Sequence, residues 1–194
     1  MRKIKFLLVA ILCVTSISLV KAETEGGWTV KVGVGASNLG GKDANTDMKF
    51  SFRLGAEYDI SLSDHFSIIP GLYLANKGFK TDAIDGTLNG YFLELPISVA
   101  GKINLSDNLT LSPKVGPYIA YGIFGSKVGW YSGGESNYFD DDMYRRFDIG
   151  LTTGLSFDYK QYAFGFEYTR GFFGVVEDFK GYNQTISFVF GYKF

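Results

Sequence analysis

An all-β fold, an eight-stranded antiparallel up-and-down transmembrane β-barrel, is predicted by three features of the sequence. Apolar and polar residues alternate with a period of two, the alternating segments number eight, and the links between them are alternately short and long. A period of two is typical of strands whose two faces meet different surroundings, whereas an amphipathic helix would repeat every 3.6 residues. The even number of segments and the order of the link lengths favour a closed membrane barrel.

The last segment, 182–194, shows the alternation most clearly. One parity is apolar and mostly aromatic, with Gln184 as its exception: Tyr182, Ile186, Phe188, Phe190, Tyr192 and Phe194. Such a strand with a terminal aromatic residue resembles the closing strand of a bacterial outer-membrane barrel, where it serves as the assembly signal. The resemblance implies that role for Phe188, Phe190, Tyr192 and Phe194, and it implies the barrel-assembly machinery as a partner during biogenesis.

Seven more strands precede it, at about 28–38, 49–62, 66–77, 90–105, 109–124, 144–159 and 162–172. In the second of them, Phe50 and Phe52 lie on one parity and Arg53 lies on the other. Across the strands the apolar parity carries almost no charge, and Arg145 at the start of the sixth strand is the exception. A charge facing lipid at mid-bilayer costs about 2–4 kcal/mol. We therefore expect the apolar parity to face lipid.

The links provide a separate test of the barrel. The links at 63–64, 106–108 and 160–161 are tight, and those at 39–48, 78–89, 125–143 and 173–181 are long. Outer-membrane barrels have short periplasmic turns and long external loops. The order of the links therefore predicts an integral outer-membrane protein of a Gram-negative cell, with its N- and C-termini in the periplasm.

The first 22 residues are expected to be a cleaved signal peptide, which leaves 23–194 as one barrel domain. Arg2, Lys3 and Lys5 form a basic start, an apolar stretch follows, and Val20-Lys21-Ala22 has the size pattern of a cleavage site. Cys13 lies inside the apolar stretch, and the residues before it fit a lipoprotein signal poorly. The mature chain thus has no cysteine for disulfides or thiolate chemistry.

The charge of the mature chain argues against nucleic acid as a partner. The leader removes four of the 19 basic residues and none of the 20 acidic ones, so the mature charge is 15 − 20, or −5. A general nucleic-acid binder would need a basic face.

The inward parity is rich in charge of both signs. Six residues are basic and six are acidic: Lys31, Arg53, Lys102, Lys114, Arg146, Lys193, Glu57, Asp59, Glu94, Asp148, Asp158 and Glu167. An eight-stranded barrel has an interior just wide enough for its own side chains. Balanced charges there predict a salt-bridged plug, because unpaired charges are costly away from water. A gated or proton-conducting lumen is the alternative interpretation.

Four segments resemble the PorT-type outer-membrane β-barrel family of Bacteroidetes. The stretch 91–97 reads Tyr-Phe-Leu-Glu-Leu-Pro-Ile, and 111–118 contains a Gly-Pro-Tyr. Phe147-Asp148-Ile149-Gly150 is followed by Gly154, and 168–172 reads Tyr-Thr-Arg-Gly-Phe where the family more often ends in Leu. The resemblance spans nearly all of the mature chain. It implies a barrel similar to the small OmpA- and OmpX-like barrels, and it implies no single activity, because fold does not fix function.

Enzyme and metal sites are weakly indicated, so we expect no catalytic residue, no cofactor and no metal. The one histidine, His65, falls in a predicted periplasmic turn, away from outer-leaflet lipid. The run 140–142 of three aspartates could offer oxygen ligands to calcium but lacks the spaced pattern of a calcium loop. Gly33-Val34-Gly35 lies within a strand, which is the wrong context for a phosphate loop.

The third long loop is the best candidate for recognition, because it mixes aromatic, flexible and polar residues: Trp130, Tyr131, Tyr138 and Phe139. These aromatics could instead lie on the barrel rim or pack as a lid. We expect a monomeric, non-enzymatic surface scaffold or adhesion protein that meets lipopolysaccharide and an envelope or extracellular protein. A component of an envelope secretion or transport assembly is the second hypothesis; a narrow pore and a lipid-modifying enzyme follow.

Overall fold

The computed structural model describes residues 26–41, 46–81, 86–128, 139, 145–176 and 179–194. Several predictions from the sequence therefore lie outside the described residues. They concern the signal peptide at 1–22, the loop aromatics Trp130, Tyr131 and Tyr138, and the three aspartates at 140–142.

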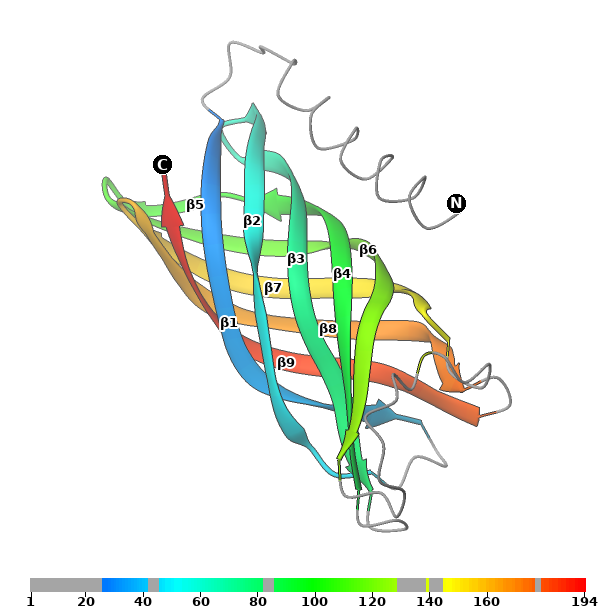
Figure 1. The fold of residues 1–194 in the computed structure, drawn as a ribbon. Helices are drawn as coiled ribbons and strands as arrows, with labels where there is room; N and C mark the ends of the chain where they lie inside the picture. The colour runs from blue at the N-terminus through cyan, green and yellow to red at the C-terminus, as the bar shows by residue number, and fades with distance from the viewer. Residues whose placement is uncertain (1–25, 42–45, 82–85, 129–138, 140–144, 177–178) are drawn as a thin grey trace.

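In the part of the chain that the structure describes, nine strands form one antiparallel sheet that closes into a barrel (Figure 1). The strands are β1 (Gly27–Gly40), β2 (Lys49–Ser63), β3 (Phe66–Thr81), β4 (Gly86–Gly101), β5 (Ile103–Ser106), β6 (Leu109–Val128), β7 (Phe147–Tyr159), β8 (Tyr162–Val176) and β9 (Phe179–Lys193). Both β4 and β5 pair with β6, and only Lys102 separates them, so together they form one strand of the barrel wall. The barrel wall therefore has eight strands, which we call staves. The predicted fold class is confirmed.

The strand bounds differ from the prediction mainly at the ends that lead into the long links. The third, fifth and seventh staves run on to Thr81, Val128 and Val176. The fourth stave, predicted to be continuous, is interrupted at Lys102. The sixth stave begins at Phe147, later than predicted. The ends of these strands extend beyond the apolar band, and there the residues do not alternate in hydrophobicity. The alternation in the sequence therefore ends before the backbone pairing of the strands does.

Closure comes from two pairings. The sheet order runs from β4 through β1 and β9 to β5, and an additional β4–β6 pairing joins its edges. The first strand pairs with the last, from Thr29 opposite Lys193 to Gly40 opposite Tyr182. A closed barrel leaves no sheet edge with unpaired backbone groups.

The two ends of the barrel differ. We call the end that holds the tight turns at 64–65, 107–108 and 160–161 the turn end, and the opposite end the loop end. Figure 1 shows that the start of β1 and the C-terminus both lie at the turn end, where the backbone N–H of Phe194 donates to the carbonyl of Trp28. Lys160, in the third turn, has a φ of 53°, a left-handed conformation that suits a two-residue hairpin.

The two faces of the sheet are inverted relative to a soluble protein. On β1, Val30 and Val32 are each 45% exposed, whereas Lys31 between them is 6% exposed. At the turn end, outward aromatic rings meet in pairs such as Trp28 with Tyr58 and Tyr162 with Tyr192. The expectation that Arg145 is the exception on the outward parity was incomplete, because Arg170 on β8 is also outward and exposed.

The outward wall is hollowed where prolines interrupt three neighbouring ladders. Register pairs are missing around Pro70 between β2 and β3, around Pro96 between β3 and β4, and around Pro117 between β4 and β6. A proline has no N–H to donate to a ladder. The same prolines, with Ala56 and Gly71, line an apolar groove of about 720 Å³ on the outer face of β1, β2, β3, β4 and β6.

Candidate functional site

The interior of the barrel holds a network of eight buried charged side chains, each at most 7% exposed. We call this set the central ion network: Lys31, Arg53, Lys77, Lys114, Glu57, Glu94, Asp148 and Glu167. Its members come from β1, β2, β3, β4, β6, β7 and β8. Four are cationic and four anionic, so the formal charges cancel.

The half of the network nearer the turn end centres on two glutamates. Glu57 Oε2 lies 2.6 Å from Lys31 Nζ, and Glu57 Oε1 lies 2.6 Å from Lys114 Nζ. Lys114 Nζ also lies 2.6 Å from Glu167 Oε1, and the other oxygen of Glu167 accepts from the Arg53 guanidinium. Each carboxylate therefore bridges two cations.

The other half leads toward the loop end. Arg53 also contacts Glu94 at 3.2 Å, and Glu94 lies 2.6 Å from Lys77 Nζ. Lys77 lies 3.6 Å from Asp148, whose Oδ2 accepts a hydrogen bond of 3.0 Å from the hydroxyl of Tyr118. The network is thus one connected chain of alternating charge.

Aromatic rings cover the cations that the carboxylates leave partly open. The guanidinium of Arg53 lies 3.9 Å from the ring centroid of Tyr73, and Lys77 Nζ lies 4.2 Å from that of Tyr118. Tyr73 and Tyr118 are each 1% exposed. Cation–π contacts are stronger when desolvated, so the rings help to stabilise cations that water does not reach.

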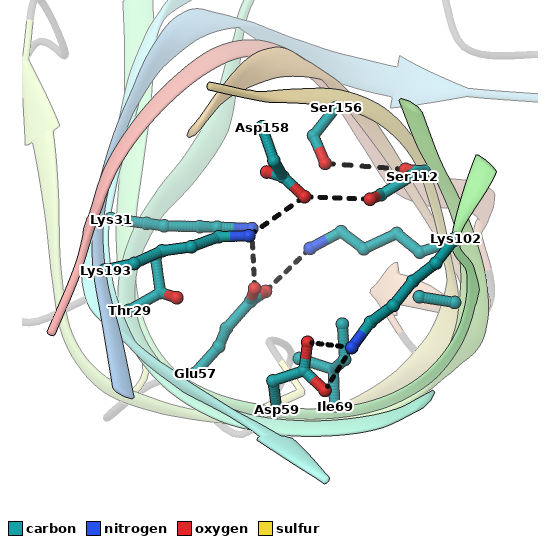
Figure 2. Close-up of a pocket in the computed structure, with 12 residues that line it drawn as sticks. Thr29, Lys31, Glu57, Asp59, Ile69, Lys102, Ser112, Ser156, Asp158 and Lys193 are labelled. Atoms are coloured by element: carbon teal, nitrogen blue, oxygen red, sulfur yellow. Dashed lines mark hydrogen bonds and ion pairs between the residues drawn. The ribbon is translucent and has the colours of Figure 1, made fainter. Parts of the chain in front are cut away.

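A smaller layer of charges closes the turn end (Figure 2). Lys102 lies 3.0 Å from Asp59, and Lys193 lies 3.0 Å from Asp158. Ser112 donates to Asp158 at 2.8 Å. The cavity between these side chains, which also borders Lys31, Glu57 and Lys114, measures about 30 Å³. That volume holds about one water molecule.

An aromatic cap closes the interior at the loop end. It consists of Leu88, Phe92, Tyr118, Ala120 and Phe139, with Phe79 packed against it. The ring of Phe139 meets Phe92 edge to face at 5.5 Å, and a Cβ at Gly122 would overlap the Phe139 ring. Phe139 is 4% exposed. The assignment of Phe139 to a surface-binding loop was therefore wrong; for this residue the lid alternative holds.

The structure brings most of the predicted lumen charges together. Eleven of the twelve form ion pairs with one another or with Lys77, and the guanidinium of the twelfth, Arg146, lies 5.3 Å from the ring of Phe139. The sequence reasoning missed Lys77. Its parity points inward, but it stood at the expected end of its strand, and the ladder continues past it to Thr81.

The remaining candidate residues that the structure describes lie on the surface. Phe188, Phe190, Tyr192 and Phe194 all face outward and are 40–78% exposed. His65 is exposed at the turn end. Among the described residues no group of three or more His, Cys, Asp or Glu side chains could hold a metal ion. The same part of the chain contains no helix long and apolar enough to cross a membrane.

Several solved structures are similar to this chain. The outer membrane enzyme PagL is 12% identical, with 84% of this chain and 98% of that chain covered and a TM-score of 0.54. Neisserial surface protein A is 14% identical, with 88% and 100% covered and a TM-score of 0.53. Ail of Yersinia pestis, solved with the heparin analogue sucrose octasulfate, is 14% identical, with 88% and 100% covered and a TM-score of 0.46. At these identities the first two likenesses show the fold alone.

The sequence comparisons are more specific to the family. No curated protein sequence matches this chain. The sequence model of the outer membrane protein beta-barrel domain matches residues 23–177, which is most of the chain. Together with the closed eight-stave barrel, this match shows that the protein belongs to the outer membrane protein beta-barrel domain family.

Proposed function

We propose that this protein is a non-enzymatic outer-membrane scaffold that binds an envelope or extracellular partner through the loops at its loop end. Its motifs further support a place among the PorT-type barrels of Bacteroidetes, with both termini in the periplasm. The observation that carries the proposal is the neutral central ion network beneath an aromatic cap. A lumen filled by its own side chains favours action at the loops over transport through the barrel.

The carboxylates of the lumen favour a structural role for the same reason. Glu57 and Glu167 each bridge two cations, and Asp148 accepts from Tyr118. A general acid or base must reach a substrate, whereas these groups are held against one another in the interior. Removing one partner of such a buried ion pair lowers the free energy of unfolding by about 3–5 kcal/mol.

The test should remove the loop aromatics while keeping the barrel capped. Deleting the whole segment from Lys127 to Asp142 would also remove Phe139 and open the cap. We would instead compare the native protein with a variant carrying Trp130→Ser, Tyr131→Ser and Tyr138→Ser, with Phe139 retained. Crosslinking in intact cells followed by purification would identify the partner.

Loss of the crosslinked partner in the triple variant, at an unchanged amount of folded barrel, is the expected result. Phe139→Ala serves as a comparison, because it opens the cap and keeps Trp130, Tyr131 and Tyr138; it should retain the partner as long as the barrel stays folded. A partner that is captured equally by native protein and triple variant would contradict recognition through these aromatics.

The alternative is a component of an envelope secretion or transport assembly, and the apolar groove around Ala56 favours it. The groove measures about 720 Å³ and its lining is almost wholly apolar, which suits an apolar membrane segment of a partner protein. Ala56→Trp would fill the groove. A partner that is lost with Ala56→Trp and kept in the triple loop variant would favour this second function over the first.

A further inference from the structure

A polar cluster interrupts the apolar outward face of β8 and β9. Gln184, the exception in the last strand, lies directly opposite Arg170 in the β8–β9 register. Tyr168 and Tyr182 lie beside this pair, and we call the four residues the outer polar cluster. Their outward neighbours are apolar, such as Phe166 at 61% exposure. The residue that broke the sequence pattern therefore belongs to a group assembled from two strands.

The contacts within the cluster direct hydrogen-bond donors away from it. The Tyr168 hydroxyl donates to Gln184 Oε1 at 3.1 Å, so the Nε2 amide of Gln184, which is a donor only, points to the other side. The guanidinium carbon of Arg170 lies 4.3 Å from the centroid of the Tyr182 ring, a cation–π contact that holds the guanidinium on the same outward face as Gln184. Gly40 on β1 gives room to both Tyr182 and Gln184, because a Cβ there would overlap them.

The depth of Arg170 places it near the edge of the hydrocarbon. It lies eight residues from Tyr162, which belongs to the aromatic belt of the turn end. Eight residues span about 26 Å of strand, or about 20 Å along the axis at a tilt near 40°. The apolar band of such barrels is about 25 Å tall. The long side chain of Arg170 therefore reaches the head groups at the loop end, where it can remain charged.

We propose that the outer polar cluster binds the phosphate group of an anionic membrane lipid in the leaflet at the loop end. The one acidic residue of β8 and β9, Glu167, is buried in the lumen, so the outer face of these strands carries no carboxylate to neutralise Arg170. Arginine binds phosphate through a planar fork of donors, and the Gln184 amide adds a further donor beside it. This site is separate from the loops of the proposed function.

Photocrosslinking to labelled lipid tests this proposal. The full-length protein, produced in a Gram-negative host with a benzophenone residue at Phe172, would be placed in phosphatidylcholine vesicles that contain a minor fraction of phosphatidylglycerol. Phe172 is outward and 62% exposed, two residues beyond Arg170 toward the loop end. Either phosphatidylglycerol or phosphatidylcholine carries the radioactive phosphorus, in two parallel experiments. We expect phosphatidylglycerol to be crosslinked well above its share of the bilayer.

Three variants decide whether the cluster is responsible. Arg170→Gln should lower the phosphatidylglycerol signal about tenfold, as expected for loss of a charge-assisted hydrogen bond. Arg170→Lys should retain part of the signal, because it keeps the charge and loses the fork. Arg145→Gln also removes one positive charge at the loop end, and it should leave the phosphatidylglycerol signal unchanged. Each variant must show the gel mobility of the folded barrel.

Three results would overturn the inference. The first is equal loss of signal with Arg170→Gln and Arg145→Gln, which would indicate unspecific attraction. The second is crosslinking of phosphatidylglycerol only in proportion to its share of the bilayer. The third is competition by inorganic phosphate in the buffer, which would mean that the cluster binds phosphate from water and not from the membrane.

Discussion

Lys77 Nζ lies 2.6 Å from Glu94 Oε2 in the centre of the barrel, with side-chain exposures of 3% and 1%. This pair connects β3 to β4, and the contact of Glu94 with Arg53 joins it to the other half of the central ion network. Its removal is the most direct way to ask what the network does.

We expect Glu94→Ala to lower the free energy of unfolding by about 3–5 kcal/mol, because Lys77 and Arg53 would lose a buried counter-charge. The thermal melting of the barrel in detergent measures this loss, and the current across a planar bilayer should stay at the background level. The double variant Lys77→Met, Glu94→Met should lose less than the sum of the single changes. A large steady current from Glu94→Ala would contradict the plug.

The contact between Gly122 and Phe139 predicts a different effect at the loop end. Gly122→Ala should cost about 1–3 kcal/mol, because the new Cβ would push the Phe139 ring out of the cap. Gly101→Ala is a matched control, since a Cβ there meets Pro113 Cγ at an ordinary distance of 3.5 Å. Urea unfolding compares the two. If Gly122→Ala remains destabilising in a Phe139→Ala background, the overlap is not the cause.

The orientation of the barrel can be measured with cysteine labelling. Lys80 is exposed at the loop end and Asp107 is exposed in a tight turn at the turn end. With the termini in the periplasm, a membrane-impermeant maleimide should label Lys80→Cys in intact cells and label Asp107→Cys only after the outer membrane is permeabilised. The reverse pattern would place the loops in the periplasm and rule out surface recognition.

The outward aromatics of β9 and of the C-terminal residue beyond it predict an effect on assembly that is separate from stability. Phe194 is 78% exposed and its ring contacts Tyr192 at 5.0 Å. Phe194→Ser should reduce the amount of folded barrel in cells while refolding of the purified chain in detergent stays unchanged. Phe166→Ser, an equally outward aromatic on β8, serves as the control. Equal losses in cells from both changes would argue against a terminal signal.

Parity in the sequence predicts which face a residue occupies, and it does so for almost every lumen charge. Parity does not predict partners across the barrel, since Arg53 and Glu167 meet although they are 114 residues apart. Lys77 was missed because alternation fades where strands leave the apolar band. Phe139 could not be placed because a loop residue has no period; the signal in its favour was the small, inward Gly122 on a neighbouring strand.

The pairing of β1 with β9 has a consequence for how the chain reaches its native state. The first strand to be synthesised, β1, can pair along its second edge only after the last strand, β9, has been made. Until that seam closes, the cations of β1 and β2 are kept from the glutamate of β8 that they meet in the finished barrel. Closing the seam thus completes the backbone ladder and brings Lys31 and Arg53 to Glu167 in one step. Folding to the native state should therefore be all-or-none, and loss of the Arg53–Glu167 contact should weaken the final closure.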